Sequence, residues 1–438
     1  MPSTAFWIES FKGNLSVIRD YAWLLSGSAG RLVLSLAYFV SVANGLSVGD
    51  FGLFATASAT GIVLSRIGGF GFVSPLYRVA TVRQRLVGIY TTGLLVAFLL
   101  SLPVVGLAAV GFYAAFFDGE MSIAAFTAVV IAEIVFWRAL EVVVIVNNGL
   151  GRFGRGASIV IAGSAIRAVA AVGFVTLGSG LLLEWSLTYL AANAAAALFA
   201  IIGFYPRQRL RFRPALYLAR WRDSVSVAGA EVIFYLQSEL DKLLVLSLGG
   251  PQMAGIYAIL MRLIDLTALP IRSANTMIVQ KLMRTPTWIA HWKMRWGLEV
   301  AVAAVSVAGL AVLGGILHVF PNALGRNVAD AAPLVLVALF VPAFRNLIEY
   351  ESELLYARGR TGLRALILAI VGLIKAGLLV VLLRAAPDTE RWILGLNGLF
   401  LVLWIVSASS TYAAFDWSRP RGGRATRRWL RPDPQPCE

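Results

Sequence analysis

Apolar segments long enough to cross a bilayer recur throughout this 438-residue chain and constrain its fold more than any other feature. Because 59% of the residues are hydrophobic and only 14% are charged, the chain lacks the polar surface of a water-soluble globule. A helix crosses a hydrocarbon core of about 30 Å with about 20 residues, so we predict about twelve transmembrane helices. They lie near 23–43, 52–74, 86–110, 122–146, 157–177, 182–204, 224–248, 253–278, 297–320, 331–355, 363–384 and 391–414.

Lys and Arg between these segments fall almost entirely on alternate connections. One side carries clusters such as those at 78–85 and 207–222, whereas the other side holds only Arg326, Arg384 and Arg391. Because positively charged loops stay in the cytoplasm, we predict a bacterial inner-membrane protein with both termini cytoplasmic. The net charge of +15 is then explained by loops that face anionic lipid, and no nucleic-acid partner is expected. The outer loops are too short to hold a folded domain.

Two offsets of the chain against itself indicate an internal repeat; the alternative is that any two helix hairpins share small residues and basic inner loops. Aligning the sequence with itself pairs 136–156 with 344–364, Arg167 with Lys375, and Gly52 with Gly255. We therefore predict an all-α membrane protein in which two pseudo-symmetric six-helix bundles flank the substrate site, as in transporters. The predicted boundaries are an interfacial segment at 1–22, bundles at 23–204 and 224–414, a basic linker at 205–223 and a basic cytoplasmic tail at 415–438.

Charged residues within the predicted spans need an explanation, because each costs at least about 2.5 kcal/mol at the bilayer centre. One reading is structural: Arg138 could pair with Glu141, and Arg262 with Asp265, at a spacing of three residues on one helix. The other reading is a cationic cavity between the bundles that suits a pyrophosphate, since arginine binds phosphate oxygens as a planar fork. Its candidate members are Arg66, Arg167, Arg262, Arg345 and Lys375, which we expect to face the space between the bundles.

Intramembrane acids have the same two readings, charge balance or coupling to a proton or sodium gradient. They are Glu133, Glu231, Glu239, Asp241 and Asp265. By contrast, we read Glu349, Glu351 and Glu353 as the solvated end of a helix. The glycines at 68–71 fit close helix packing or a hinge. The sequence shows no catalytic triad, P-loop or metal motif, so no cofactor is expected.

The stretches GLSVGDFGLFATASATGIVLSRIGGFGFVSPLYR (45–78), LDKLLVLSLGGPQMAGIYAILMRLIDLTALPIRSANTMIVQKL (240–282) and LLYARGRTGLRALI (354–367) resemble Wzx-type polysaccharide-unit flippases. These belong to the multidrug/oligosaccharidyl-lipid/polysaccharide (MOP) exporter superfamily. The resemblance implies a V-shaped, MATE-like pair of bundles that alternates between inward and outward states. It also implies that the substrate is an undecaprenyl-pyrophosphate-linked glycan, moved between leaflets for O-antigen, lipopolysaccharide or exopolysaccharide biosynthesis, with polysaccharide polymerase or assembly proteins as partners.

The resemblance also assigns roles to individual residues. Arg31, Arg66 and Arg262 occupy spans that carry cavity arginines in related lipid flippases. Asp241 matches an acid that takes part in cation coupling, with Glu239 and Asp265 as substitutes and H⁺ or Na⁺ as the ion. We expect Asp241→Asn to slow transport without loss of folding. A MATE-type multidrug antiporter is the main alternative, and a membrane-embedded polysaccharide polymerase or ligase is the second.

Overall fold

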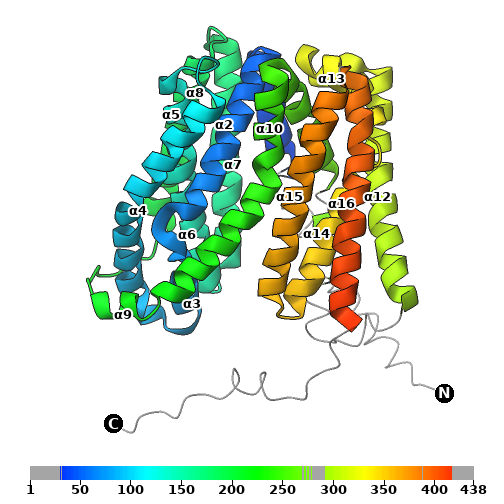
Figure 1. Ribbon diagram of the computed structural model, residues 1–438. Helices are drawn as coiled ribbons and strands as arrows, with labels where there is room; N and C mark the ends of the chain where they lie inside the picture. The colour runs from blue at the N-terminus through cyan, green and yellow to red at the C-terminus, as the bar shows by residue number, and fades with distance from the viewer. Residues whose placement is uncertain are drawn as a thin grey trace, which may run out of the picture.

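The computed structural model describes residues 30, 32–268, 271–272, 274–275, 278, 292–386 and 388–416. These residues are nearly all helical and contain no strand (Figure 1). The helices are 32–45, α2 (Val48–Ile67), η1 (Gly68–Gly71), α3 (Val73–Val82), η2 (Gln84–Leu86), α4 (Val87–Phe116), α5 (Ile123–Ile131), η3 (Ala132–Trp137), α6 (Arg138–Gly149), α7 (Phe153–Leu177), α8 (Leu182–Phe204), α9 (Pro214–Leu218), α10 (Trp221–Thr267), α12 (Trp292–Val319), η4 (Pro321–Leu324), α13 (Arg326–Val337), α14 (Val341–Ala357), α15 (Thr361–Ala385) and α16 (Thr389–Asp416).

The helices account for about twelve membrane crossings, as predicted. Among the described residues, 8 helices are long and apolar enough to cross a membrane, and the pair α13 and α14, bent by 74°, forms one more broken span. The long helix α10 is two spans joined at Gly250, whose φ of 76° reverses the chain just before Pro251. The hydroxyl of Tyr257 accordingly reaches Asp241, although 16 residues of straight helix would separate the two by about 24 Å.

The N-terminal half (residues 32–204) and the C-terminal half (residues 221–416) meet along α2 and α10, which lie side by side in the centre of Figure 1. Gly52 and Gly255 bring the two backbones together, since a Cβ added at Gly255 would lie 1.9 Å from the carbonyl oxygen of Val48. The sequence repeat paired these two glycines. We call the end of the molecule that carries α3 and α9 the basic end (Figure 1). Gly52 lies near the start of α2, which is the end of that helix farther along the chain from α3.

The glycines at 68–71 form a kink and a close contact together, which confirms the sequence interpretation. Gly69 and Gly71 have φ values of 73° and 72°, so the backbone leaves the α2 direction and restarts as α3. A Cβ on Gly71 would lie 2.2 Å from the carbonyl oxygen of Ser224 on α10. The kink therefore positions the first helix of α10 against the N-terminal half.

Candidate functional site

A cluster of charged side chains crosses between the halves where α2, α6 and α10 meet. Arg66 on α2 donates two hydrogen bonds to the carboxylate of Glu141 on α6, at 2.9 and 3.1 Å. Its guanidinium lies 4.1 Å from the ring centroid of Tyr235 on α10. Arg138 bonds the same Glu141 carboxylate at 2.9 Å and reaches Glu231 on α10 at 3.3 Å. We call these five residues the interface cluster; both of its arginines are 5% exposed.

Arg262 on α10 also bridges the halves, and its partner is neutral. Its guanidinium donates a hydrogen bond to the hydroxyl of Ser35 on helix 32–45. The suggested pairing with Asp265 on the same helix is not formed. Asp265 instead contacts Arg345 of α14 at 3.4 Å and Arg272 at 3.3 Å. Among the residues that the structure describes, Arg262 forms no salt bridge and its guanidinium bonds a hydroxyl, an arrangement that suits an incoming anion.

Lys375 of α15 forms a buried ion pair with Asp241 of α10 at 2.8 Å, and the two side chains are 7% and 6% exposed. Its ammonium also donates to the carbonyl oxygen of Gln237 at 2.9 Å, while Tyr257 donates to Asp241 at 2.7 Å. These contacts direct Lys375 towards α10, the helix that meets α2 at the junction of the halves. Pairing with a neighbouring acid compensates a lysine that is desolvated in the membrane.

Glu239, another coupling candidate, is paired with Lys242 on the next turn of α10. Each of the three coupling candidates thus has a cationic partner: Lys375 for Asp241, Lys242 for Glu239, and Arg345 with Arg272 for Asp265. Arg31, the remaining cavity candidate, lies outside the described residues.

Arg167 of α7 lies within the N-terminal half. Its guanidinium stacks 3.8 Å from the ring centroid of Trp137, at the end of the π-helical turn η3. The same turn carries Glu133, which is 3% exposed and accepts hydrogen bonds from Ser58 and Tyr189, both at 2.6 Å. Such π-helical insertions frequently occur at functional sites. Because hydroxyls rather than a salt bridge hold Glu133, this acid differs from the paired acids of α10.

Glu351 is a buried acid that the sequence interpretation placed wrongly in a solvated helix end. It is 0% exposed and accepts a hydrogen bond from Ser407 of α16. Its neighbour Glu353 is not free in solvent either, since it pairs with Arg364 at 2.8 Å. A signal was available in the sequence: Leu347 and Leu355, four residues to either side of Glu351, are buried on the same face of α14.

Comparisons with known proteins identify the fold. No family model matches the chain, and no curated protein matches it. Among solved structures, the chain is similar to the inward-facing conformation of a multidrug resistance MATE family transporter of the MOP superfamily, with a TM-score of 0.63 and 15% identity over 89% of this chain and 96% of that one.

Two further solved structures match over the same share of this chain. One is a MOP superfamily transporter from Pyrococcus furiosus Vc1, described as having a binding pocket of reverse polarity that suggests a different function; its TM-score is 0.59 at 15% identity, with 92% of that chain covered. The other is the lipid II flippase MurJ in an inward closed conformation, with a TM-score of 0.58, 12% identity and 87% of that chain covered.

The chain therefore has the fold of MOP-superfamily transporters and crosses a membrane several times. At 12–15% identity these similarities define the architecture alone.

Proposed function

We propose that this protein flips undecaprenyl-pyrophosphate-linked oligosaccharide units across the bacterial inner membrane, for O-antigen or exopolysaccharide biosynthesis. One observation carries the proposal: arginines of both halves lie at contacts between them. Arg66 and Arg138 of the N-terminal half reach α10, and Arg262 of α10 donates to a neutral hydroxyl on helix 32–45 among its described hydrogen bonds. A cation held at the moving boundary of an alternating-access transporter suits an anionic substrate. The planar guanidinium matches a diphosphate better than an organic cation.

The interface cluster explains how such a site stays stable when it is empty. Two arginines and two carboxylates compensate one another, so neither guanidinium is left as an unpaired buried charge. A diphosphate offers oxygens that replace those of Glu231 or Glu141 as acceptors for Arg66 and Arg138. Where the substrate replaces Glu231, binding exchanges the Arg138 contact between the halves for a contact with the substrate, which couples occupancy to their relative movement.

Coupling to H⁺ or Na⁺ belongs to the same proposal, with Asp241, Glu239 and Asp265 as its candidates. A proton or sodium ion that reaches Asp241 competes directly with Lys375, whose ammonium lies 2.8 Å from that carboxylate. Release of Lys375 from α10 would loosen α15 from α10, since the pair is a direct link between these helices. The contact between Asp241 and Lys375 would therefore couple ion binding to movement of α15 relative to α10.

The solved structures support a range of substrates for this fold. One is described as a lipid II flippase and another as having a binding pocket of reverse polarity. A MATE-type antiporter of organic cations is the second candidate. The buried Glu133 lies beside Tyr189, and Trp185 packs 5.9 Å from that ring, an acidic and aromatic environment that suits cations. Arg167, which stacks on Trp137 in the same half, is a positive charge and argues against binding of an organic cation there.

Deleting the gene tests the proposal. A flippase mutant should store lipid-linked repeat units that face the cytoplasm and stay protected from a membrane-impermeant glycan-modifying reagent. Expression of the wild-type chain should restore exposure on the periplasmic side. Single repeat units displayed outside the membrane would indicate a polymerase instead. Normal surface polysaccharide together with increased sensitivity to cationic dyes would indicate the antiporter.

A further inference from the structure

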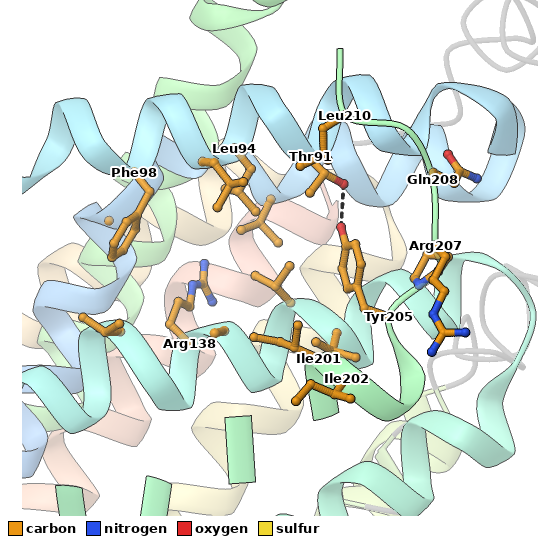
Figure 2. Close-up of a pocket in the computed structure, with 18 of the residues that line it drawn as sticks. Thr91, Leu94, Phe98, Arg138, Ile201, Ile202, Tyr205, Arg207, Gln208 and Leu210 are labelled. Atoms are coloured by element: carbon orange, nitrogen blue, oxygen red, sulfur yellow. Dashed lines mark hydrogen bonds between the residues drawn. The ribbon is translucent and has the colours of Figure 1, made fainter. Parts of the chain in front are cut away.

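A crevice opens in the N-terminal half, and Arg138 of the interface cluster is one of the residues that line it. Its volume is about 580 Å³, and α4, α6, α8 and residues 205–210 surround it (Figure 2). Apolar side chains form most of its walls, among them Leu94, Leu95, Phe98, Ile201 and Ile202. Leu95 is 49% and Ile202 is 70% exposed, so the crevice faces the surroundings of the helices. For a membrane-spanning half, these surroundings are lipid chains.

The segment that follows α8 closes the crevice at the basic end and is held in place there. The side-chain oxygen of Gln208 accepts the backbone N–H of Gly88 at 2.9 Å, and its amide donates to the carbonyl oxygen of Gln84 at 3.0 Å. Thr91 donates to the carbonyl oxygen of Val87, so the hydroxyl of Tyr205 donates to Thr91, at 2.5 Å (Figure 2). Hydrogen bonds therefore fix residues 205–208, which form the polar rim of the crevice, against Gln84 and α4.

Charge and apolarity are separated along the crevice. Arg207, Gln208 and Tyr205 lie together at the basic end, whereas Phe98 and Leu94 lie towards the other end (Figure 2). Arg209 and Arg211 follow on the same exposed segment. A ligand that fits this distribution has an anionic head and an apolar chain. Basic pockets between transmembrane helices on the cytoplasmic side commonly bind anionic lipid headgroups.

We propose that this crevice binds one chain of an anionic membrane phospholipid, with the lipid phosphate at Arg207 on the basic rim. The chain fills space that would otherwise leave the walls without packing partners, and dispersion contacts with it replace the missing ones. The occupant is a bilayer lipid rather than the transported substrate, so the inference does not depend on the proposed function. The bound lipid holds residues 205–210 against α4, and this segment leads into the connection between the two halves.

The crevice and the interface cluster share one residue, Arg138. Arg138 is one of the residues that line the crevice, and its guanidinium bonds Glu141 of α6 and Glu231 of α10. A lipid chain that packs on the stem of Arg138 therefore supports the side chain that links α6 to α10. Lipid composition at the basic end is expected to influence the contact between the halves through this residue.

The experiment measures phospholipid retained by the purified full chain after a detergent wash. The protein is first reconstituted with equal amounts of phosphatidylglycerol and phosphatidylcholine, and the bound lipid is counted by mass spectrometry. Leu95→Trp fills the crevice, and Arg207→Gln removes the charge at its rim. Leu99→Trp, one turn further along α4 and also exposed, is the matched control for the tryptophan. Arg326→Gln, an exposed arginine at the opposite end, is the control for the charge.

The wild-type chain and both controls should retain phosphatidylglycerol in preference to phosphatidylcholine. Leu95→Trp should lose retention of both lipids, and Arg207→Gln should lose the preference by about fivefold, the equivalent of about 1 kcal/mol per arginine near a membrane surface. Equal retention by Leu95→Trp and Leu99→Trp would overturn the site. Retention without preference for the anionic lipid would overturn its chemistry, as would displacement of phosphatidylglycerol by undecaprenyl phosphate at equal concentration. Thermal unfolding of each variant excludes misfolding as the cause.

Discussion

At the scale of single residues, Arg262 is the side chain whose substitution separates binding from folding. It bonds a hydroxyl across the junction and is not part of a described salt bridge, so Arg262→Ala leaves no buried carboxylate unpaired. We expect delivery of lipid-linked glycan to the periplasm to fall by about tenfold to a hundredfold, because a hydrogen bond to a charged group contributes about 1.5–3 kcal/mol. The measurement is delivery normalised to membrane expression. Arg326→Ala is the control, and normal delivery by Arg262→Ala would remove Arg262 from the phosphate site.

The buried ion pair of Asp241 and Lys375 changes the expectation, drawn from the sequence, that Asp241→Asn leaves folding intact. Asp241→Asn should not leave folding intact, because it strands a lysine that is 7% exposed. Removing one partner of a buried pair costs about 3–5 kcal/mol, whereas replacing both with neutral groups costs much less. The unfolding temperature in detergent should therefore fall for Asp241→Asn and for Lys375→Met, and recover in the double variant. Additive losses in the double variant would contradict the coupling.

Residue contacts were predictable from the sequence only where they are local. Arg138 pairs with Glu141 as their spacing indicated. The same spacing failed for Arg262 and Asp265, because Arg345 arrives from α14 and occupies the carboxylate. One-dimensional spacing gives the candidates for a salt bridge, but tertiary packing decides among them.

At the scale of elements, the contact between α2 and α10 depends on two glycines. A Cβ at Gly255 would meet the Val48 carbonyl oxygen at 1.9 Å, so Gly255→Ala has to push two backbones apart. We expect a loss of about 1–3 kcal/mol in stability, the usual cost of overpacking, measured by thermal unfolding. Gly315→Ala on α12 is the control, because no atom lies within 4 Å of its added Cβ. An unchanged unfolding temperature for Gly255→Ala would show that the helices separate without cost.

The sequence predicted the number of membrane-spanning helices but not the breaks within them. Twelve apolar segments appear as about twelve crossings, because hydropathy reports burial in lipid directly. The break between α13 and α14 was missed, as the segment at 331–355 read as one continuous span. Pro333 and Pro342 lie on either side of the bend and were the available signal. The π-helical turn at Ala132–Trp137 has no comparable signature in the sequence.

At the scale of the whole molecule, the halves are held together at the end opposite the basic end by amide side chains. Asn44 donates to the carbonyl oxygen of Leu324 at 2.8 Å and accepts the backbone N–H of Asn327 at 3.1 Å. Asn327 in turn donates to the carbonyl oxygens of Ala43 and Leu46 at 2.7 and 2.6 Å. Alternating access requires these contacts to open when the substrate leaves at this end, so they form a gate in the proposed transport cycle.

Locking this gate should stop transport in a reversible way. In a chain with Cys437→Ser, which removes the single native cysteine, we place cysteines at Asn44→Cys and Asn327→Cys. Their backbones are close enough for a side chain of one to bond the main chain of the other, a separation that suits a disulfide. Under oxidising conditions the double variant should accumulate substrate on the cytoplasmic side, because the halves remain joined at the opposite end. Reduction should restore delivery, and each single-cysteine variant should deliver normally under both conditions. Full delivery by the oxidised double variant, with the disulfide verified by mass spectrometry, would mean that the substrate leaves without separation of these helices, and the alternating-access mechanism would have to be abandoned for this protein.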